Sequence, residues 1–357
     1  MLIISGERTL AAETALPVRV ERAFSIASVS KLRLCDFEVK PLAEESLGVR
    51  SMSIFVATPH AAILLDPGVS LAPRRFGLPP HPEEFRALLN ARRRVLESAE
   101  EADTVVVTHY HRDHFTPSYE SLFECCDPSE FETVYKSKKV FVKRVDSKTP
   151  FSQKKRAWRL FRDLEKISTP ATQIGEEEVR LGGLTLRFFP CVHGDARLGS
   201  VLVVQIRSSS DCSLIYAPDV QGPVDDETAN RILAERFELA FVGGPPLYLN
   251  TISSRKGIEE KVAKGLDNLV RIIRRNPGRV VVAHHMLRSA EWMETLESFG
   301  IEERDVRTYS SLLGMTPTLL EANRKVLYES DPPPPDYKQL LQENKGRSCS
   351  KLLEEIG

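Results

Sequence analysis

Short apolar runs separated by turn-forming residues are the main pattern along the chain. Runs of about four to eight residues rich in Val, Ile, Leu and Phe are typical of β-strands, and unbroken runs are typical of strands covered on both faces. The pattern predicts a hairpin over residues 176–190 that turns at Gly182 and Gly183. It also predicts strands over residues 32–39, 53–58, 61–65, 103–108, 140–145, 200–206, 213–217, 239–242 and 279–283.

Longer segments between these runs repeat their apolar residues every three to four positions, which is the period of an amphipathic helix. They predict helices over residues 82–102, 152–167, 227–235, 258–275, 289–299 and 310–322. Strands that first follow one another directly and then alternate with helices indicate a layered α/β domain, rather than a helical bundle or an all-β sandwich.

The pattern divides the chain into three parts. Residues 1–30 are weakly patterned and are expected to be an extension. Residues 31–325 are expected to form one domain, and residues 326–357 a charged tail whose short helix follows the prolines at 332–335.

Composition narrows the class of protein. The 357 residues are 41% apolar and 28% charged, with a net charge of −1, as in soluble globular proteins. Because no stretch approaches the ~20 apolar residues of a membrane span and the start lacks the pattern of a signal peptide, we expect a cytoplasmic protein with no membrane partner. The six cysteines are spaced like neither a zinc ribbon nor a disulfide framework, so mostly reduced thiols are expected. The oligomeric state stays open.

The densest chemical signal follows the apolar run at 105–107. There His109, His111, Asp113 and His114 form the pattern H-x-H-x-D-H. Buried imidazoles and carboxylates need partners, and a divalent cation satisfies several of them at once. The motif therefore predicts a metal site at the exit of a buried strand.

Three later strands also end in potential ligands. His193 follows the run at 186–192, Asp219 follows 214–217, and His284 and His285 follow 280–283. Strand ends at one edge of an α/β sheet converge in space, and such edges carry binding sites. We expect these side chains to complete the site that begins at His109.

A further strand end, Asp66 with Gly68, completes a family resemblance. In order and spacing these residues resemble the metallo-β-lactamase superfamily over roughly residues 32–290. Within it, the chain resembles the archaeal UPF0282 group of predicted metal-dependent hydrolases, on the segments 45–51, 66–69, 76–79, 152–156 and 284–288.

The resemblance implies a four-layer αββα sandwich with two divalent metal ions, usually zinc, with iron and manganese as alternatives. It implies that His109, His111 and His193 hold the first ion. Asp113, His114 and the late histidine would hold the second, and Asp219 would bridge both. A hydroxide between the two ions would then attack a phosphoryl or carbonyl group. Asp66 lies outside this ligand set and is expected to orient a ligand or the loop that carries His109.

Two histidines compete for the last position. Residues 105–109 and 280–284 share one arrangement, a β-branched run, a small residue and a histidine, so we favour His284. His285 would then face the substrate as an acid or an oxyanion donor. With Asp113 and Asp66 it makes up the candidate catalytic groups.

Candidate substrate contacts come from basic and loop residues. Residues 136–166 hold 12 Lys and Arg against 3 acids, with Phe151, Trp158 and Phe161 among them. A solvated helix face with aromatics in the core is the default interpretation. The alternative is contact with a phosphate-bearing small molecule or nucleic acid, through Lys155 and Arg156. Arg288 and Tyr248 are the other candidate contacts.

These features favour a metal-dependent hydrolase of phosphoesters, with nucleic acid among the substrates considered. Hydrolysis of a thioester or lactone is the nearest alternative, because the same metal site suits it. From other classes we keep an iron-dependent redox enzyme and a non-catalytic nucleic-acid-binding protein. An imidazole at His111, where diiron oxygen reductases carry a carboxylate, favours zinc hydrolysis.

Overall fold

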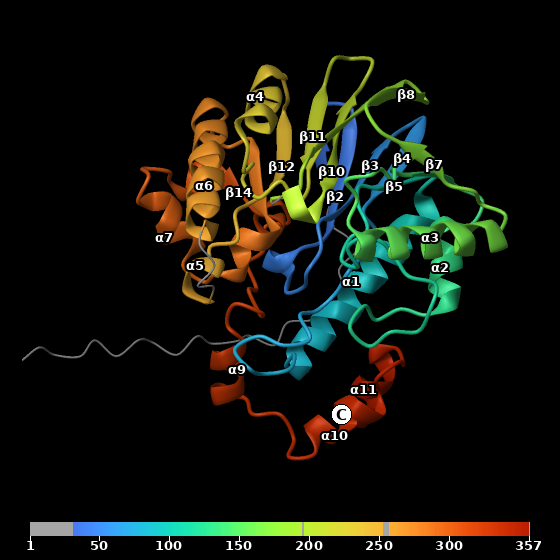
Figure 1. Cartoon of the computed structure of the whole chain (residues 1–357), viewed down its shortest axis with the longest axis vertical. Helices are drawn as coiled ribbons and strands as arrows, with labels where there is room; N and C mark the ends of the chain where they lie inside the picture. Colours follow the sequence, from blue (N-terminus) through green and yellow to red (C-terminus); the bar gives the residue numbers. More distant parts are fainter. Residues whose placement is uncertain (1–30, 195, 253–256, 357) are drawn as a thin grey trace, which may run out of the picture.

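Two seven-stranded β-sheets lie face to face, and helices cover the outer face of each (Figure 1). The computed structural model describes residues 31–194, 196–252 and 257–356. The extension expected at residues 1–30 lies outside the described residues. One apolar core fills the space between the sheets, and two others lie between each sheet and its helices. The expected four-layer αββα sandwich is therefore confirmed.

The first sheet follows the order of the sequence, with antiparallel pairing from β1 to β4 and parallel pairing from β4 to β7. Its strands are β1 (Leu32–Leu34), β2 (Phe37–Ala43), β3 (Ser53–Thr58), β4 (Ala61–Leu65), β5 (Thr104–Val107), β6 (Lys139–Lys143) and β7 (Thr172–Ile174). All four residues of β5 are buried, as expected for a parallel strand covered on both faces.

The second sheet repeats this plan, with antiparallel pairing from β8 to β11 and parallel pairing from β11 to β14. Its strands are β8 (Glu177–Leu181), β9 (Leu184–Val192), β10 (Ser200–Arg207), β11 (Ser213–Ala217), β12 (Leu239–Gly243), β13 (Val280–Ala283) and β14 (Val306–Arg307). Because β9 and β11 are both antiparallel to β10, they point the same way. The ends of β9, β11 and β13 therefore meet at one edge.

The outer layers are helical. The first sheet is covered by α1 (Pro82–Glu101), α2 (Pro128–Tyr135) and α3 (Phe151–Lys166), and the second by α4 (Asp226–Ala234), α6 (Ile258–Arg275) and α7 (Trp292–Glu297). Shorter helices are α5 (Leu249–Ile252), α8 (Tyr309–Leu312), α9 (Arg324–Ser330), α10 (Tyr337–Glu343) and α11 (Cys349–Ile356), with 3-10 turns at Glu45–Leu47, Ala196–Leu198, His284–Arg288 and Glu303–Asp305. No helix in the described ranges is long and apolar enough to cross a membrane.

The start of α1 shows how local sequence sets an element. Pro82 occupies the first turn, where its missing N–H costs nothing. Glu84 Oε2 accepts a hydrogen bond from His81 N at 2.7 Å, and His81 Nδ1 accepts one from Glu83 N at 3.3 Å. The helix then buries Phe85, Leu88 and its other apolar positions against the first sheet.

Two predicted elements differ most from the structure in extent. The strand expected over 32–39 is two strands, because Cys35 has a φ of +52° and turns the chain. The helix expected over 310–322 ends at Leu312. Gly314, at a φ of +67°, terminates it and Pro317 follows, a combination that does not continue a helix.

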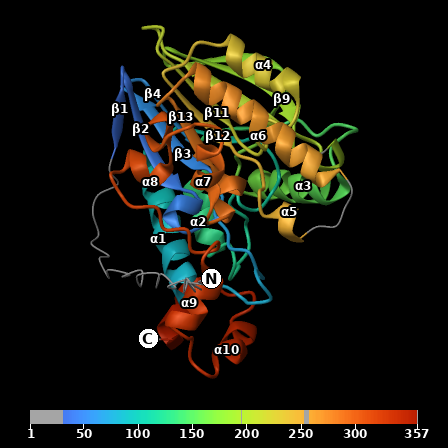
Figure 2. The same cartoon turned by 90° about the vertical axis from the view of Figure 1, so that its left-hand side faces the viewer.

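The segment expected to be a charged tail packs into the domain. It contains α10, α11 and most of α9, where one short helix was predicted. Cys349 and Leu352 of α11 are buried in the core beneath α1. Both views place this segment at the far end of α1 (Figures 1 and 2). The segment was expected to be a tail because its sequence is rich in charged residues and only a few apolar positions pack it against the domain.

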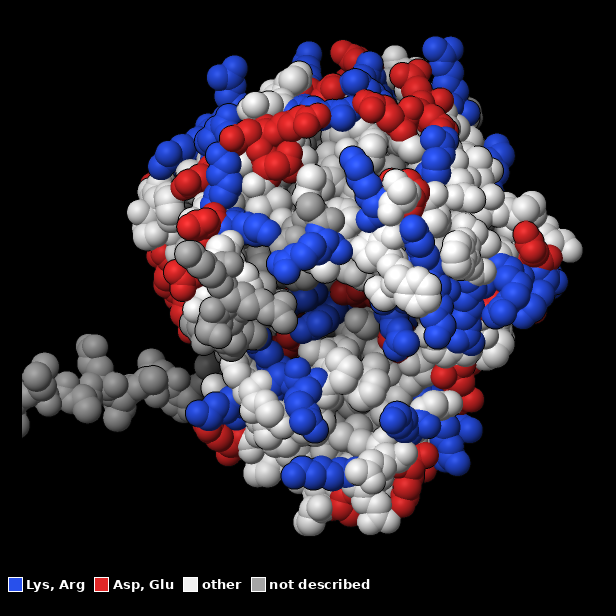
Figure 3. Space-filling view, viewed as in Figure 1, with Lys and Arg blue, Asp and Glu red and all other residues white. Residues whose placement is uncertain are grey.

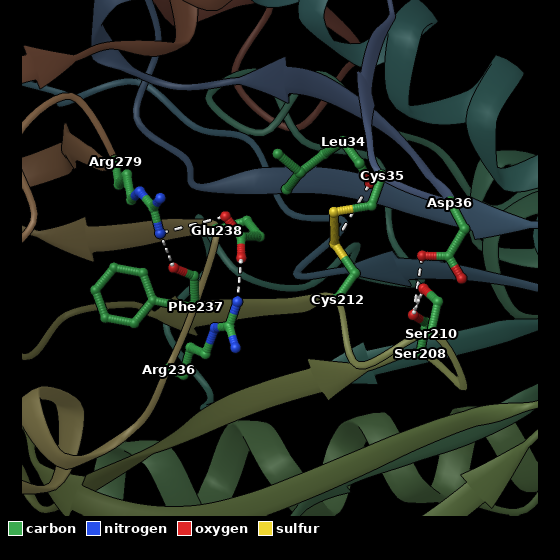
Figure 4. Close-up of a disulfide and its surroundings, with 10 residues drawn as sticks. All are labelled: Leu34, Cys35, Asp36, Ser208, Ser210, Cys212, Arg236, Phe237, Glu238 and Arg279. Atoms are coloured by element: carbon green, nitrogen blue, oxygen red, sulfur yellow. Dashed lines mark hydrogen bonds and ion pairs between the residues drawn. A yellow bond between two sulfur atoms is a disulfide. The ribbon is translucent and has the colours of Figure 1, made fainter.

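The expectation of mostly reduced cysteines was also wrong. Cys125 and Cys349 form a disulfide that fastens α11, and Cys35 and Cys212 form a second one. The latter joins the β1–β2 turn to the β10–β11 turn, so it links the two sheets (Figure 4). Only Cys126 and Cys191 are free thiols, both buried. Because the paired residues are 177 and 224 positions apart, spacing along the chain did not reveal them.

A partly buried ion pair joins the segment before α9 to the connection between β2 and β3. Arg50 donates from Nε to Oε2 of Glu321 and from Nη2 to Oε1, each at 2.6 Å. Burial raises the pKa of Glu321, but Arg50 above all and then Arg288 and Arg324 outweigh it and lower that pKa to about 2. The carboxylate therefore contributes stability above its ordinary pKa of 4.5 and loses it as the pH falls towards 2.

We expect Glu321→Gln to lower the free energy of unfolding by about 3 kcal/mol at pH 7, measured by urea denaturation. The difference from the original protein should shrink below pH 4.5, where the unfolded chain becomes protonated. Glu132→Gln, at the exposed Lys136–Glu132 pair, is the matched control and should cost less than about 1 kcal/mol. A loss at Glu321 that stays constant from pH 7 to pH 3 would contradict the assignment.

Candidate metal centre

Five strand ends bring the predicted ligands to one place. Asp66 follows β4, the His109–His114 motif follows β5, and His193, Asp219 and His284 follow β9, β11 and β13. These residues and His285 form overlapping groups whose ligand atoms lie within 4.8 Å of one another. Each sheet thus contributes one half of the cluster.

The backbone at three of these strand ends is strained. Asp66, Asp219 and His284 have φ values of +45°, +52° and +62°, in the left-handed region that costs non-glycine residues free energy. Such outliers persist where the surrounding structure holds them and cluster at functional sites. Here the left-handed turn aims each side chain across the edge of its sheet.

The first group consists of His109, His111, His193 and one oxygen of Asp219. His193 Nε2 lies 3.1 Å from His111 Nδ1 and 3.0 Å from Asp219 Oδ2. His109 Nε2 lies 3.2 Å from the same oxygen. Three nitrogens and a carboxylate oxygen converging in this way match the donor set that zinc prefers.

The second group consists of Asp113, His114 and His284. His284 Nε2 lies 3.6 Å from Asp113 Oδ2 and 2.9 Å from Asp219 Oδ1. His114 Nε2 lies 3.4 Å from Asp219 Oδ1. The two oxygens of Asp219 therefore face different groups, as expected of a bridging carboxylate.

Unsatisfied buried atoms show that a cation fits this cluster. His109 Nε2, His114 Nε2 and Asp219 Oδ1 are buried and have no hydrogen-bond partner in the described part of the chain. Buried polar atoms of this kind are rare without a partner. Because all three point into the cluster from its two sides, divalent metal ions are the partners that suit the donor set.

Burial sets the protonation of the first group. It lowers the pKa of His109 well below its ordinary value and also lowers that of His111, so both are neutral imidazoles with a lone pair to donate. For Asp219, burial raises the pKa, but His284 and His114 outweigh it and hold the pKa well below its usual range. The carboxylate is therefore ionised.

Asp66 has the surroundings of an orienting residue. Its Oδ1 accepts a hydrogen bond from Thr108 N at 2.7 Å, and its Oδ2 lies 2.8 Å from His114 Nδ1. Tyr216 and the Thr108 hydroxyl donate to Oδ2 as well. Gly68 lets this turn pack on the motif, because a Cβ there would overlap the backbone nitrogens of His114 and Phe115.

Both late histidines face the cluster. His284 Nε2 is 2.9 Å from Asp219, whereas His285 Nε2 is 3.7 Å away and neither of its ring nitrogens has a hydrogen-bond partner among the described residues. Of the overlapping groups of potential ligands, two contain His284 and one contains His285. The geometry favours His284 as the ligand and leaves His285 for another role.

Two acids that the sequence analysis gave no role support His284. Glu45 Oε1 lies 3.0 Å from His284 Nδ1, and Glu44 Oε1 accepts a hydrogen bond from His284 N at 3.0 Å. Burial, then the negative charge of Glu45, raise the pKa of Glu44 to about 8. The sequence signal that could have revealed these two acids is an acidic pair that precedes a glycine turn in an otherwise apolar stretch.

Arg288 lies in the interior and not at a solvent-facing rim. Only 3% of it is exposed, and its Nε donates to Glu45 Oε1 at 2.8 Å. Its Nη2 lies 3.1 Å from His284 Nε2 and 3.7 Å from Asp113 Oδ2. Tyr248, the other candidate contact from this sheet, has its ring 4.5 Å from the Arg75 guanidinium.

The remaining candidates, Lys155 and Arg156, line a cavity of about 440 Å³ between α3 and the loop after His114. Burial and Arg112 lower the pKa of Arg156, while Asp113 raises it. The Arg156 guanidinium therefore interacts electrostatically with Asp113 of the second group. Gln153, which the sequence did not single out, reaches His111 Nε2 at 3.4 Å and donates to Leu198 O at 2.8 Å. One side of α3 therefore adjoins the metal centre.

We expect Glu45→Gln to weaken metal binding at the second group more than at the first, since His284 is the candidate ligand that Glu45 contacts. Loss of such an orienting carboxylate costs about 10- to 100-fold in affinity. Calorimetric titration of metal-free protein with Zn²⁺ should show one binding event unchanged and one weakened. Glu38→Gln, on β2 and paired with Lys31, is the control. Equal weakening of both events would contradict the division into two groups.

Known structures and sequences resemble this chain to different degrees. A possible metal-dependent hydrolase from Veillonella parvula has a TM-score of 0.45 at 17% identity, covering 73% of this chain and 94% of that one. CmlA, a diiron β-hydroxylase from Streptomyces venezuelae, has a TM-score of 0.39 at 16% identity, covering 68% and 43%. Similarities this low carry no information on activity.

The sequence relatives are closer. A UPF0282 protein of Pyrobaculum arsenaticum is 39% identical over 302 residues, which cover 83% of this chain and 95% of the relative. One from Thermococcus gammatolerans is 36% identical and covers 82% and 95%. The family model of the β-lactamase superfamily domain matches residues 61–286, which include every strand end of the cluster. The chain therefore belongs to the β-lactamase superfamily, and within it to the UPF0282 family.

Proposed function

We propose that the protein is a metal-dependent hydrolase of phosphoesters. The observation that carries the proposal is the cavity beside the His and Asp cluster, because its lining holds one acid, Asp163, against four cations: Arg112, Lys155, Arg156 and Arg159. Fixed positive charge next to a two-metal centre suits a substrate that is already anionic before the reaction. A neutral thioester or lactone would gain nothing from it.

In this proposal His109, His111 and His193 would hold one ion, Asp113, His114 and His284 would hold the other, and Asp219 would serve both. Two such ions would supply an activated water and polarise the phosphoryl oxygen. We propose zinc for both positions, with iron and manganese as the alternatives, because the donors are mostly imidazoles and His111 is not a carboxylate.

The chain's own groups place the substrate and handle protons. Lys155 and Arg156 bind the phosphate at the mouth of the cavity. His285 lies beside the oxygen of Asp219 that faces the first group, and burial lowers its pKa well below the ordinary value. It is therefore neutral, and its ring N–H can donate a hydrogen bond to an oxygen on the phosphorus.

A panel of activated substrates tests the proposal. The protein loaded with Zn²⁺, Mn²⁺ or Fe²⁺ should hydrolyse an activated phosphodiester faster than a thioester or a lactone, and chelation should abolish turnover until metal is returned. Asp219→Asn should lower kcat/KM by more than about 100-fold, more than the loss of an outer partner costs. Asparagine tolerates the left-handed backbone at this position, so the fold should survive.

The control is Asp211→Asn, the same substitution at an exposed turn with a φ of +62°, which should leave kcat/KM unchanged. Faster turnover of the thioester or lactone would favour acyl chemistry. Iron in the purified protein together with oxygen consumption would favour a redox enzyme. Two bound ions with no turnover of any substrate would contradict hydrolysis.

A further inference from the structure

Helix α3 exposes aromatic side chains that nothing in the described chain covers. Phe151 is 78% exposed and Trp158 is 57% exposed. They stand seven residues apart, two helical turns, and so share one face. Large exposed aromatics that fall on one surface are informative, because a folded chain normally buries them.

Cations alternate with these rings on the same face. Lys155 and Arg162 continue the i, i+4, i+7, i+11 row that Phe151 and Trp158 begin. The helix carries six Lys and Arg against two acids, Asp163 and Glu165. Space-filling shows Lys and Arg gathered over this region and around the central hollow (Figure 3).

The acids of α3 leave part of this charge uncompensated. Asp163 pairs with Lys166 at 2.8 Å and with Arg162 at 3.4 Å. Lys155 makes no ion pair or hydrogen bond with any residue that the structure describes. Arg159 lies 4.0 Å over the ring of Tyr119 at the wall of the cavity, so a cation and a ring stand side by side there too.

The exposed row leads into the cavity and from there to the metal centre. Phe115, Phe131 and Leu160 line the cavity together with its four cations and Asp163. At the start of the same helix, Gln153 reaches His111. A ligand lying along α3 would therefore pass from aromatic and cationic surface to the reacting groups without leaving the protein.

We propose that α3 and this cavity bind single-stranded nucleic acid. This proposal rests on the phosphoester hydrolysis proposed above and names the substrate class of that reaction. Bases stack on Phe151 and Trp158, and backbone phosphates pair with Lys155, Arg156 and Arg159. Alternating stacking platforms and cations are how proteins hold single strands without reading sequence. A duplex hides the faces of its bases and cannot use the rings.

An anionic lipid surface is the competing occupant, since basic helices with exposed aromatics also bind membranes. Such helices separate an apolar face, which enters the lipid, from a charged face. On α3 the rings and the cations share one row, so inserting Phe151 and Trp158 would pull Lys155 and Arg162 into the lipid as well. This arrangement favours nucleic acid.

The test is fluorescence anisotropy of labelled 12-mers with the full-length protein in chelator, so that binding is measured without hydrolysis. Single-stranded RNA and DNA should bind, the duplex of the same sequence should bind at least about tenfold more weakly, and affinity should fall as salt rises. Comparing the affinities for single-stranded RNA and DNA shows which polymer is preferred. Binding to phosphatidylserine vesicles is measured as the fourth comparison.

Trp158→Ala should weaken single-strand binding by about tenfold or more while leaving the melting temperature unchanged, because the ring is exposed. Met315→Ala, which removes another exposed apolar side chain (53%), is the matched control and should bind normally. In Trp292→Phe, where Trp158 is the remaining tryptophan, single strands should quench the emission.

Equal affinity for duplex and single strand, or tighter binding to vesicles, would overturn the proposal. So would normal binding by Trp158→Ala. Binding in chelator with no turnover after metal loading would instead sink the proposed hydrolysis and leave a nucleic-acid-binding protein. The two failures are therefore distinguishable.

Discussion

A single buried carboxylate, Asp219, lies among six imidazoles, and the rest of the site is arranged around it. Its oxygens are 2.9 to 3.7 Å from ring nitrogens of His109, His111, His114, His193, His284 and His285. An ionised group out of reach of water needs strong partners. One of its oxygens, Oδ1, has no hydrogen-bond partner among the described residues, so the cluster suits a divalent cation as a further partner.

The fold meets this requirement by repeating one plan twice. Each sheet changes from antiparallel to parallel pairing, so each delivers several strand ends to the same edge. The price is backbone strain at Asp66, Asp219 and His284. Contacts from distant segments hold these turns in place, namely Thr108 and Tyr216 on Asp66 and the Glu44–Glu45 pair on His284.

Sequence patterns predicted the parts of the site that lie on regular elements. Strands β3, β4 and β11 and helix α6 have the predicted bounds. The candidate ligands stand at strand ends, so the apolar periodicity also located them within the fold. Sequence patterns did not predict Glu45, Gln153 or the disulfides, because each of them contacts or bonds a partner far along the chain. Glu45 and His284 are 239 residues apart, and no local period encodes such a pair. Nor did they predict the packing of α11 against the domain, because this helix has few apolar positions.

Average composition also gave no sign of the basic helix α3 beside the candidate metal centre. The net charge of −1 gives no hint of an anionic partner, yet α3 concentrates six cations beside a centre that itself accumulates positive charge when loaded. Like charges placed together are unfavourable unless an anion occupies the space between them. In the function we propose, the inner cluster sets the reaction class and the outer helix selects the substrate. Changes on the exposed row of α3 can therefore alter specificity without disturbing Asp219 or the strands that hold it.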